Sequence, residues 1–465
     1  MIVSGSATAV PVLPPGAASS RPMSYRVANV TSTALLTDQY ELTMISAALA
    51  AGTADRQCVF EVFARRLPDG RRYGVVAGTG RLLDELADFR FGAAELEAVR
   101  DLVDEPTAQW LADYRFRGDI DGYSEGELFF PNSPILSVRG GFAEAVVLET
   151  LILSVLNHDS AVASAAARMV SAAAGRPVIE MGSRRTHEQA AVAAARAAYL
   201  CGVGATSNLE AARTYGVPSA GTAAHSWTLS FTGDDGPDER AAFAAQIARH
   251  GVGTTLLVDT YDITAGVRNA IEVAGPELYA VRIDSGDLGV LARQVRQQLD
   301  DLGATGTKIV VSGDLDEYAI ASLRAEPVDI YGVGTALVTG SGAPTAGMVY
   351  KLVEVDGLPV AKRSSQKESL GGAKRAVRAA RDTGTVLEEI LYRDGEPAPQ
   401  PRAGENLRPL QIPLIRDGKR VDDVPTLAQS RELLARGLVS LPWEGLGLSH
   451  GDPAIGTRYL SRPGA

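Results

Sequence analysis

The sequence contains few of the residues from which metal centres and disulfide frameworks are built. It has five histidines and two cysteines in 465 residues. Cys58 and Cys201 lie far apart, and neither has a histidine or second cysteine at the spacing of a zinc ligand pair. We therefore expect two reduced, partly buried thiols and no disulfide. The sequence identifies no metal ligands.

An excess of basic residues is also absent. The chain has 45 Lys and Arg against 56 Asp and Glu, a net charge of −11. Nucleic-acid-binding domains present a basic face, so we expect no nucleic-acid partner. The sequence has no uninterrupted run of about 18 apolar residues, so we expect no membrane partner and a cytoplasmic location.

Several common catalytic motifs are missing as well. The chain contains no GxxxxGK[ST] phosphate loop, no GxGxxG dinucleotide fingerprint, no HExxH zinc motif and no GxSxG nucleophile elbow. Nucleotide-binding proteins, metalloproteases and hydrolases of those types are therefore not indicated.

The organisation along the chain predicts two folded regions after a tail. Residues 1–28 are rich in Ala, Pro, Ser and Gly and predict a disordered tail. Residues 29–165 predict an α+β domain, with a helix that starts after Thr37 or Asp38. Residues 346–465 contain a hairpin signal, one further clear helix within 426–438, and otherwise irregular Pro-rich sequence. We expect this last segment to pack on the N-terminal domain.

Residues 166–345 have a different rhythm, in which short apolar runs end in small or polar residues and are followed by amphipathic helices. The runs are residues 177–185, 204–208, 218–226, 255–262, 279–287, 308–314 and 329–335. This alternation is typical of parallel strands joined by helices. The number of units favours an irregular α/β barrel as the catalytic domain, with an open doubly wound sheet as the alternative.

The unusual polar residues follow these predicted strands. In an α/β barrel the carboxyl ends of all strands meet at one face, where active sites form. Ser183, Arg184 and Arg185 follow the first run, and guanidinium groups match carboxylates and phosphates. Arg282 and Asp284 alternate with apolar neighbours, so both side chains should point into the barrel. A charged pair in a core is costly unless it serves a site.

Two glycine-containing turns lie at the ends of the last two runs. Ser312 and Gly313 precede an expected helix, where capping and anion binding are both possible roles. Gly334 and Thr335 would let a phosphate approach the backbone closely. The same four letters, GVGT, also occur at residues 251–254 before a strand, so the pattern alone is weak evidence.

One histidine lies in an unusual setting. His225 occurs in the stretch GTAAHSW, surrounded by small residues at a predicted strand end. It could be a core histidine, a metal ligand, a general base, or a nucleophile that carries a covalent group. The strand-end position disfavours the core role, and the shortage of His and Cys partners disfavours a metal ligand.

An ordered series of motifs resembles nicotinate phosphoribosyltransferase over roughly residues 30–380. The motifs are TDQYELTM, MGSRRTHE, TSNLEAARTYGVPSAGTAAHSW, LVDTYD, VRIDSGDL, VVSGDLDEY, YGVGTALVT and KRSSQKESLGGAKR. The resemblance implies a type II phosphoribosyltransferase fold and a homodimer with shared active sites. It also implies the formation of nicotinate mononucleotide and pyrophosphate from nicotinate and 5-phosphoribosyl 1-diphosphate, coupled to hydrolysis of ATP, with Mg²⁺.

The resemblance also implies roles for individual residues. Tyr40 would stack on the pyridine ring, in its own or the partner subunit's site, and Thr222 would contact nicotinate. Arg282 would bind the nicotinate carboxylate, with Arg184 or Arg185 nearby. Thr335 and Gly334 would hold the phosphoribosyl phosphate, with help from Ser312 and Gly313. Ser183 is a further candidate for substrate binding, and His225 would be phosphorylated by ATP. The chemistry of the transfer, and not the resemblance, suggests one more role: the migrating ribosyl carbon becomes cation-like, so we expect the Asp284 carboxylate to stabilise it.

The sequence leaves three alternative functions open. The alternatives are a nicotinamide or a quinolinate phosphoribosyltransferase of the same fold, and a non-catalytic phosphosugar-binding barrel. LLVDTYD resembles the paired-acid loop of type I phosphoribosyltransferases, but Asp259 and Asp262 are not adjacent, so we discount that match. His187 has no assigned role.

Overall fold

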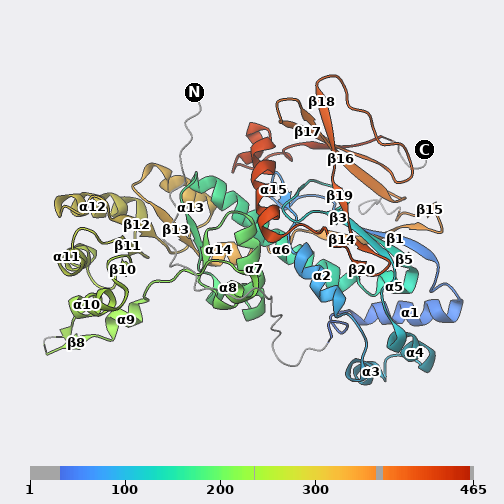
Figure 1. The fold of residues 1–465 in the computed structure, drawn as a ribbon, viewed down its shortest axis with the longest axis horizontal. Coiled ribbons are helices and arrows are strands. Elements are labelled where there is room, and N and C mark those ends of the chain that lie inside the picture. Colours follow the sequence, from blue (N-terminus) through green and yellow to red (C-terminus); the bar gives the residue numbers. More distant parts are fainter. Residues whose placement is uncertain (1–31, 235, 363–369, 461–465) are drawn as a thin grey trace. The chain divides into compact units, whose positions relative to one another are not determined.

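The structure is a computed structural model that describes residues 32–234, 236–362 and 370–460 (Figure 1). The tail predicted for residues 1–28 lies outside the described residues, as do residues 363–369 of the motif KRSSQKESLGGAKR. The predicted irregular α/β barrel with an additional α+β domain is confirmed, although the barrel sheet curls only part of the way round.

The α+β part is built on a seven-stranded sheet that draws strands from both ends of the chain. Its order is β15-β14-β1-β5-β3-β19-β20, and the neighbours whose pairing is described are antiparallel. The strands are β1 (Gln57–Ala64), β3 (Asp119–Tyr123), β5 (Leu136–Gly141), β14 (Met348–Val355), β15 (Leu358–Pro359), β19 (Gln411–Arg416) and β20 (Lys419–Arg420). The predicted hairpin is β14–β15, and its turn at Asp356 and Gly357 has the positive φ angles that such turns need.

Helices cover this sheet and enclose its core. The helices are α1 (Gln39–Ala51), α2 (Thr79–Ala87), α3 (Ala93–Val99), α4 (Glu105–Asp113) and α5 (Phe142–Val146). Helix α1 starts where the sequence predicts, because Asp38 is its N-cap and Glu41 completes a capping box. A short pair, β2 (Gly74–Val75) and β4 (Leu128–Phe129), adjoins the long helix α6 (Glu149–Ala173).

The parallel sheet has the strand order of a barrel. Its order is β10-β11-β12-β13-β6-β7. Of the strands in this sheet, β13 comes last in the sequence and β6 comes first, and these two pair with each other. The strands are β6 (Val178–Glu180), β7 (Ala205–Thr206), β10 (Thr255–Leu257), β11 (Ala280–Ile283), β12 (Lys308–Val311) and β13 (Ile330–Val333). Ser219 adds one parallel bridge beside β7, and no further pairing within the described residues joins it to β10. The sheet is therefore open at the segment that carries His225.

Helices line one side of this parallel sheet. They are α7 (Glu188–Leu200), α8 (Leu209–Tyr215), α9 (His225–Leu229), α10 (Glu239–His250), α11 (Ile263–Ala274), α12 (Leu288–Asp301), α13 (Glu317–Ser322) and α14 (Thr335–Val338). Figure 1 shows α10, α11 and α12 ranged along one side of β10–β12. Alternate strand residues such as Leu256, Val281 and Ile309 pack in this helix-facing core. The residues between them, including Ala280, Val310 and Ile330, form a smaller cluster on the concave face.

Alanines allow α6 and α7 to pack closely. Ala163, Ala166 and Ala167 of α6 and Ala194 and Ala198 of α7 are fully buried in one core. Phe142–Ala173 is long and apolar enough to cross a membrane by length and composition alone, but 67% of its most apolar window is buried in the fold. Core helices of globular proteins show the same property.

The C-terminal region is more regular than the sequence predicted. A four-stranded sheet of order β18-β16-β17-β21 occupies most of the segment that we expected to be irregular. Its strands are β16 (Lys374–Arg381), β17 (Val386–Arg393), β18 (Glu405–Pro409) and β21 (Gly456–Tyr459). The predicted helix is observed as α15 (Leu427–Ser440). These strands were not predicted because β16 and β17 contain several charged residues and no regular alternation of apolar and polar residues; one of these charges, Arg378 of β16, pairs with Glu389 of β17.

Candidate functional site

The strand ends of the half-barrel bring together a polar cluster centred on Arg282. Arg282 lies on β11 and Asp284 directly follows this strand, and the predicted alternation with buried Val281 and Ile283 is observed. The guanidinium donates through Nε to Ser312 Oγ at 2.7 Å, through Nη1 to Thr222 Oγ1 at 3.1 Å and through Nη2 to Asp284 Oδ1 at 2.7 Å. Three of its five N–H groups are thus used, and two remain for a ligand.

Asp284 is held in its ionised form by this cluster. Burial raises the pKa of Asp284, but the hydrogen bonds from Ser312 and Arg282 and the charges of Arg282 and His225 outweigh burial and lower it. The opposite charges of Arg282 and Asp284 therefore offset the cost of burying each other, and Asp284 keeps a negative charge beside the open end of the sheet.

His225 lies at the edge of the same cluster. It is the first residue of α9, and its side chain is 40% exposed. Its Nδ1 is 3.1 Å from Thr260 Oγ1, and its Nε2 is 4.0 Å from both Asp259 Oδ1 and Asp284 Oδ2. Gly221, in the loop before it, has open space where a Cβ would be. The imidazole therefore has one nitrogen beside a hydroxyl group and the other facing two carboxylates.

Asp259 is part of the site, although no role was predicted for it from the sequence. Its Oδ2 accepts hydrogen bonds from Asp284 N at 2.9 Å and Ser285 Oγ at 2.8 Å, while its buried Oδ1 has no hydrogen-bond partner. Asp262, which we had grouped with it, instead caps α11 through Ala265 N. The position of Asp259 just after a buried apolar strand could have identified it as a site residue. Its motif was discounted because it lacks the two adjacent acids of type I phosphoribosyltransferases, but that criterion applies to a different fold.

The Ser312-Gly313 turn lies against this cluster. Ser312 is buried, and its hydroxyl contacts Arg282 and Asp284. Gly313 has φ 127°, and a Cβ there would lie 3.0 Å from the Asp284 carbonyl oxygen, so this position requires glycine. The next helix, α13, starts after its cap Asp316, so Ser312 and Gly313 precede the helix as expected but do not form its first turn.

A second group of predicted residues lies at the ends of β6 and β13. Ser183, Arg184 and Arg185 form a 3-10 turn directly after β6. Both guanidiniums are exposed, and neither has an ion-pair partner among the residues that the structure describes. Gly334 caps α14, which begins at Thr335, and a Cβ on Gly182 would meet the Gly334 carbonyl oxygen at 2.9 Å. The arginine turn and the glycine turn are therefore in contact.

Tyr40 is not brought into either group. It lies on α1 in the α+β part, is 45% exposed, and has Glu149 as a neighbour. Burial, followed by the negative charges of Glu149, Glu41 and Asp38, raises the pKa of Tyr40 to about 12. Leu35 and Leu36, just before α1, are also exposed.

Two other features of the sequence have structural explanations. His187 is the N-cap of α7, where its Nδ1 accepts from Gln189 N at 3.3 Å. The second GVGT stretch, residues 251–254, lies between α10 and β10 and so at the amino end of its strand. It is thus at the opposite end of the sheet from the candidate site.

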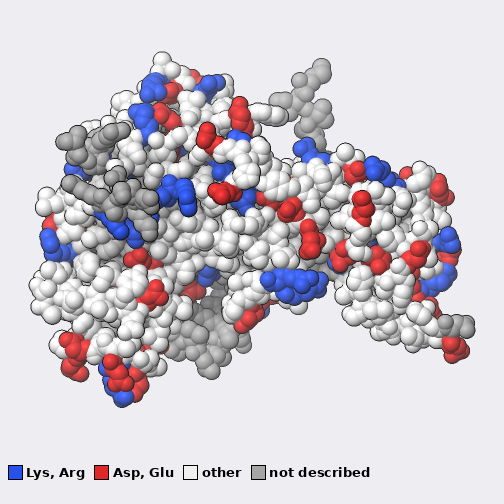
Figure 2. Space-filling view, turned by 180° about the vertical axis from the view of Figure 1, so that it is seen from behind, with Lys and Arg blue, Asp and Glu red and all other residues white. Residues whose placement is uncertain are grey.

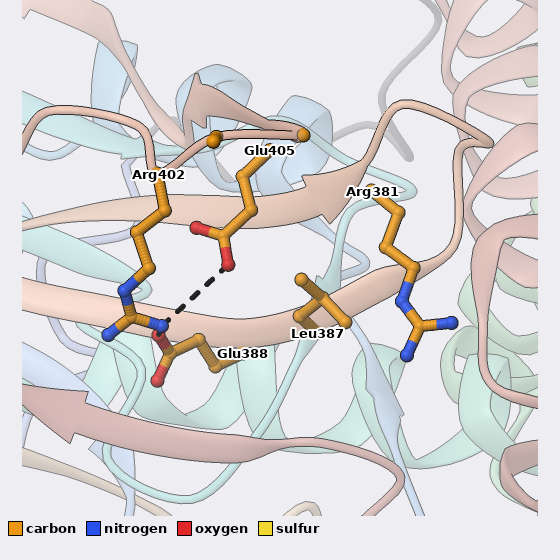
Figure 3. Close-up of a pocket in the computed structure, with 7 residues that line it drawn as sticks. Arg381, Leu387, Glu388, Arg402 and Glu405 are labelled. Carbon is orange, nitrogen blue, oxygen red and sulfur yellow. Dashed lines mark ion pairs between the residues drawn. The ribbon is translucent and has the colours of Figure 1, made fainter.

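A shallow pocket of about 560 Å³ on the C-terminal sheet does not coincide with this site (Figure 3). Its charges largely pair with one another, since Arg402 lies 3.6 Å from Glu388 and 3.7 Å from Glu405. Figure 3 shows Arg381 pointing away from this pair. On the face drawn in Figure 2, acidic and basic side chains are interspersed, without a broad basic surface.

The cluster can contribute ligands to a divalent cation but does not enclose one by itself. The described residues contain no group of three or more His, Cys, Asp or Glu side chains with metal-binding geometry. Asp284 Oδ2 and Asp259 Oδ1 accept no hydrogen bond that the structure describes. Magnesium is commonly bound by one or two carboxylates together with substrate phosphates, so the donor set fits that arrangement.

Comparisons with known proteins agree with this geometry. The nicotinate phosphoribosyltransferase N-terminal domain matches residues 35–157, and the nicotinate phosphoribosyltransferase family model matches residues 177–386. The chain is 65% identical over 429 residues to nicotinate phosphoribosyltransferase pncB1 of Mycobacterium tuberculosis, covering 92% of this chain and 95% of that protein. It is 31% identical to the human nicotinate phosphoribosyltransferase, over 88% of this chain and 91% of the relative.

Solved structures show the same fold. The crystal structure of human nicotinic acid phosphoribosyltransferase matches with a TM-score of 0.79 at 28% identity, covering 91% of this chain and 97% of that one. A nicotinate-nucleotide pyrophosphorylase from Pyrococcus furiosus matches with a TM-score of 0.74 at 24% identity, covering 90% of this chain and 99% of that one. The second likeness concerns the fold alone.

Proposed function

The chain belongs to the nicotinate phosphoribosyltransferase family, and we propose that it joins nicotinate to 5-phosphoribosyl 1-diphosphate at the strand ends of the half-barrel, with ATP hydrolysis coupled through His225. The observation that carries this proposal is the cluster of Arg282, Asp284 and His225 at the open edge of the sheet. We place the reaction in cytoplasmic NAD salvage.

The transfer step needs orientation and charge more than proton chemistry. The pyridine nitrogen attacks C1 of the ribose with its free lone pair, a C–N bond forms, and the C–O bond to pyrophosphate breaks. No general base is required because the attacking nitrogen carries no proton. The ribosyl carbon becomes cation-like, and the ionised Asp284 lies where it would stabilise that charge. Mg²⁺, held by Asp284 or Asp259 and diphosphate oxygens, would neutralise the leaving group.

Arg282 is the residue that we assign to the nicotinate carboxylate. Its two unused N–H groups are available to a carboxylate, and its side chain is only 12% exposed. Thr222 holds the guanidinium from the other side and lies in the same loop as His225. The phosphate of the ribosyl substrate is assigned to Gly334 and Thr335, with Ser183, Ser312 and Gly313 contributing donors. The exposed guanidiniums of Arg184 and Arg185 supply positive charge.

His225 accepts the phosphoryl group from ATP, and the surroundings favour Nδ1 as the acceptor atom. The two carboxylates near Nε2 stabilise an Nε2–H and would repel a phosphate there. Nδ1 then carries the lone pair, and Thr260 lies beside it. An N–P bond forms at Nδ1 while the terminal P–O bond of ATP breaks and ADP leaves; hydrolysis later releases phosphate. The protein is thus a transient phosphoprotein of the ligase class.

A homodimer would complete the site. Tyr40 is exposed on α1 beside exposed Leu35 and Leu36. We propose that this surface meets a second copy of the chain, so that Tyr40 stacks on the pyridine in the partner subunit's site. The mass of the protein in solution tests the dimer.

One assay tests the proposed function. The protein is incubated with 5-phosphoribosyl 1-diphosphate, Mg²⁺ and nicotinate, nicotinamide or quinolinate, each with and without ATP. We expect a mononucleotide from nicotinate, faster with ATP. Mononucleotide from nicotinamide or quinolinate but not from nicotinate would overturn the substrate assignment, and no product from any base would favour a phosphosugar-binding barrel.

The coupling is tested with labelled ATP and His225→Ala. We expect this variant to lose ATP stimulation and protein labelling while slow ATP-independent turnover persists. His187→Ala is the matched control, because that histidine caps α7 and is 68% exposed. Label that still appears on the His225→Ala protein would rule out His225 as the acceptor.

A further inference from the structure

A buried carboxylate beneath the arginine turn has no role in the mechanism above. Glu180 is the last residue of β6 and has no solvent exposure. It lies two residues after Val178, which packs in the helix-facing core, so its side chain points away from the concave face. Within the described ranges it forms no ion pair, and burial raises its pKa despite hydrogen bonds from Thr206 and Gly182. A buried acid without a cation is costly to retain.

The carboxylate of Glu180 accepts hydrogen bonds from two residues next to the Ser183–Arg185 turn. The Gly182 N–H donates to Oε1, and the Thr206 hydroxyl donates to Oε2. Thr206 Oγ1 in turn accepts from Asn208 N at 3.0 Å, and Asn208 Nδ2 donates to Ser183 Oγ at 3.1 Å. Glu180 therefore fixes the beginning of the turn directly, and it holds the Ser183 side chain indirectly, through Thr206 and Asn208.

The same residue also sets the distance between two proposed phosphate-binding segments. Gly182 packs directly against the Gly334 carbonyl oxygen, so a shift of Gly182 would move the arginine turn relative to Gly334 and Thr335. The exposed guanidiniums of Arg184 and Arg185 have no ion pairs of their own within the described chain to hold them. Their placement depends on the backbone of the turn.

We propose that Glu180 is a positioning residue for the phosphoribosyl substrate: through Gly182 and Thr206 it holds the Ser183–Arg185 turn at the proper distance from the Gly334–Thr335 turn. The inference rests on the proposed function. It predicts an effect on 5-phosphoribosyl 1-diphosphate that nicotinate does not share, because Arg282 and Thr222 lie on other strands and loops.

Glu180→Gln is the main test, measured by steady-state kinetics with each substrate varied in turn. A carboxylate accepts from two donors, whereas the amide offers one oxygen and places an NH2 against the other donor. We expect the KM for 5-phosphoribosyl 1-diphosphate to rise about tenfold, with kcat and the KM for nicotinate within about threefold of wild type. A structural role alone would instead lower the thermal midpoint and change all three constants together.

Two substitutions of Thr206 provide the second test, in case Glu180→Gln does not fold. Thr206→Val keeps the shape of the side chain but removes the hydroxyl, so we expect it to reproduce the selective rise in KM. Thr206→Ser keeps the hydroxyl and should restore values close to wild type. An unchanged KM for 5-phosphoribosyl 1-diphosphate in Thr206→Val, or an equal effect of both substitutions, would overturn the proposal.

The matched control is Glu239→Gln. Glu239 is another buried acid of the same half-barrel and forms no ion pair within the described part of the chain. It accepts a hydrogen bond from Asn269 Nδ2 at 3.1 Å, and burial raises its pKa. Its substitution should leave the KM for 5-phosphoribosyl 1-diphosphate unchanged. If wild-type protein makes no nicotinate mononucleotide, the proposed function fails; if it does and Glu180→Gln binds the substrate normally, only this inference fails.

Discussion

At the scale of single residues, His225 is defined by oxygens that are distant in sequence. Thr260 and Asp259 follow β10, and Asp284 follows β11. Asp259 is fixed by its two hydrogen bonds to Asp284 N and Ser285 Oγ, which leaves its second oxygen directed at the imidazole. At 4.0 Å this oxygen is beyond hydrogen-bond distance of Nε2, so its negative charge, and not a hydrogen bond, favours the tautomer with a proton on Nε2.

Asp259→Asn should therefore impair phosphorylation of His225. The amide oxygen must serve the two donors at Asp284 N and Ser285 Oγ, which turns the NH2 group toward the Nε2–H of the imidazole. Two facing donors disfavour the reactive tautomer. We expect the rate of protein labelling from radioactive ATP to fall by about tenfold or more, since orienting carboxylates contribute at least that much.

Asp262→Asn is the control for this prediction. Asp262 caps α11 through Ala265 N, and Asn caps helices as well as Asp does. Labelling should remain within about twofold of wild type. Asp259→Asn protein that is labelled as fast as wild type would show that Asp259 does not orient His225.

At the scale of elements, helix α1 carries a buried acid that forms no ion pair with any residue that the structure describes. Glu41 has no exposure; its Oε1 accepts from Thr150 N at 3.0 Å and Thr150 Oγ1 at 2.8 Å, and its Oε2 accepts from Asp38 N at 3.3 Å. Burial raises the pKa of Glu41 to about 7, although the hydrogen bonds from Thr150 and Asp38 oppose this effect. Near neutral pH the side chain therefore titrates, next to Tyr40.

The stability of the protein should decline as this acid ionises. A folded-state pKa above the unfolded value means that the folded chain binds the proton more tightly, so the stabilisation is complete below about pH 4.5 and is lost as pH rises through about 7. The thermal midpoint of wild type should fall between pH 5 and pH 8. In Glu41→Gln this fall should be reduced, by up to about 3 kcal/mol in free energy of unfolding.

The control is another acid at the same helix position. Glu95 completes the capping box of α3, where it accepts from Gly92 N at 2.9 Å. Glu95→Gln should leave the pH dependence of the thermal midpoint as in wild type. If Glu41→Gln also retains the wild-type pH dependence, ionisation of Glu41 is not its cause.

At the scale of the whole described chain, one buried acid joins segments from four regions. Glu317 of α13 accepts from Arg71 at 2.8 Å and Arg168 of α6 at 3.0 Å, and Ser341 donates to its other oxygen. Arg168 also donates to the Leu448 carbonyl at 3.3 Å. Burial raises the pKa of Glu317, but the hydrogen bonds from Ser341 and Arg168 and the charge of Arg71 lower it overall, so the acid is ionised.

Removing this charge should destabilise the fold strongly. Glu317→Gln leaves two buried guanidiniums without a counter-charge, and breaking a buried ion pair in this way costs about 3–5 kcal/mol. We expect a large drop in the urea midpoint of unfolding, followed by tryptophan fluorescence. Glu272→Gln breaks the exposed pair with Arg240 and should cost less than about 1 kcal/mol. Equal midpoints for the two variants would contradict the linking role of Glu317.

The sequence by itself determined the parallel α/β region, the start of α1 and the strand-end location of Arg282, Asp284 and Ser312. It could do so because hydrophobic periodicity, capping residues and turn glycines are local signals, and because parallel strands gather their carboxyl ends at one face. His225 was found in the same way, from a short apolar run and small neighbours.

Only the tertiary structure decided which groups surround these residues. Asp259 and Thr260 meet His225, and Glu180 meets Thr206, through pairing and loop packing that no single segment encodes. The half-open barrel and the interleaving of β1 with β14 also depend on contacts between distant segments. Such contacts are set by the packing of the complete chain, whereas sequence patterns report only on the nearest few residues.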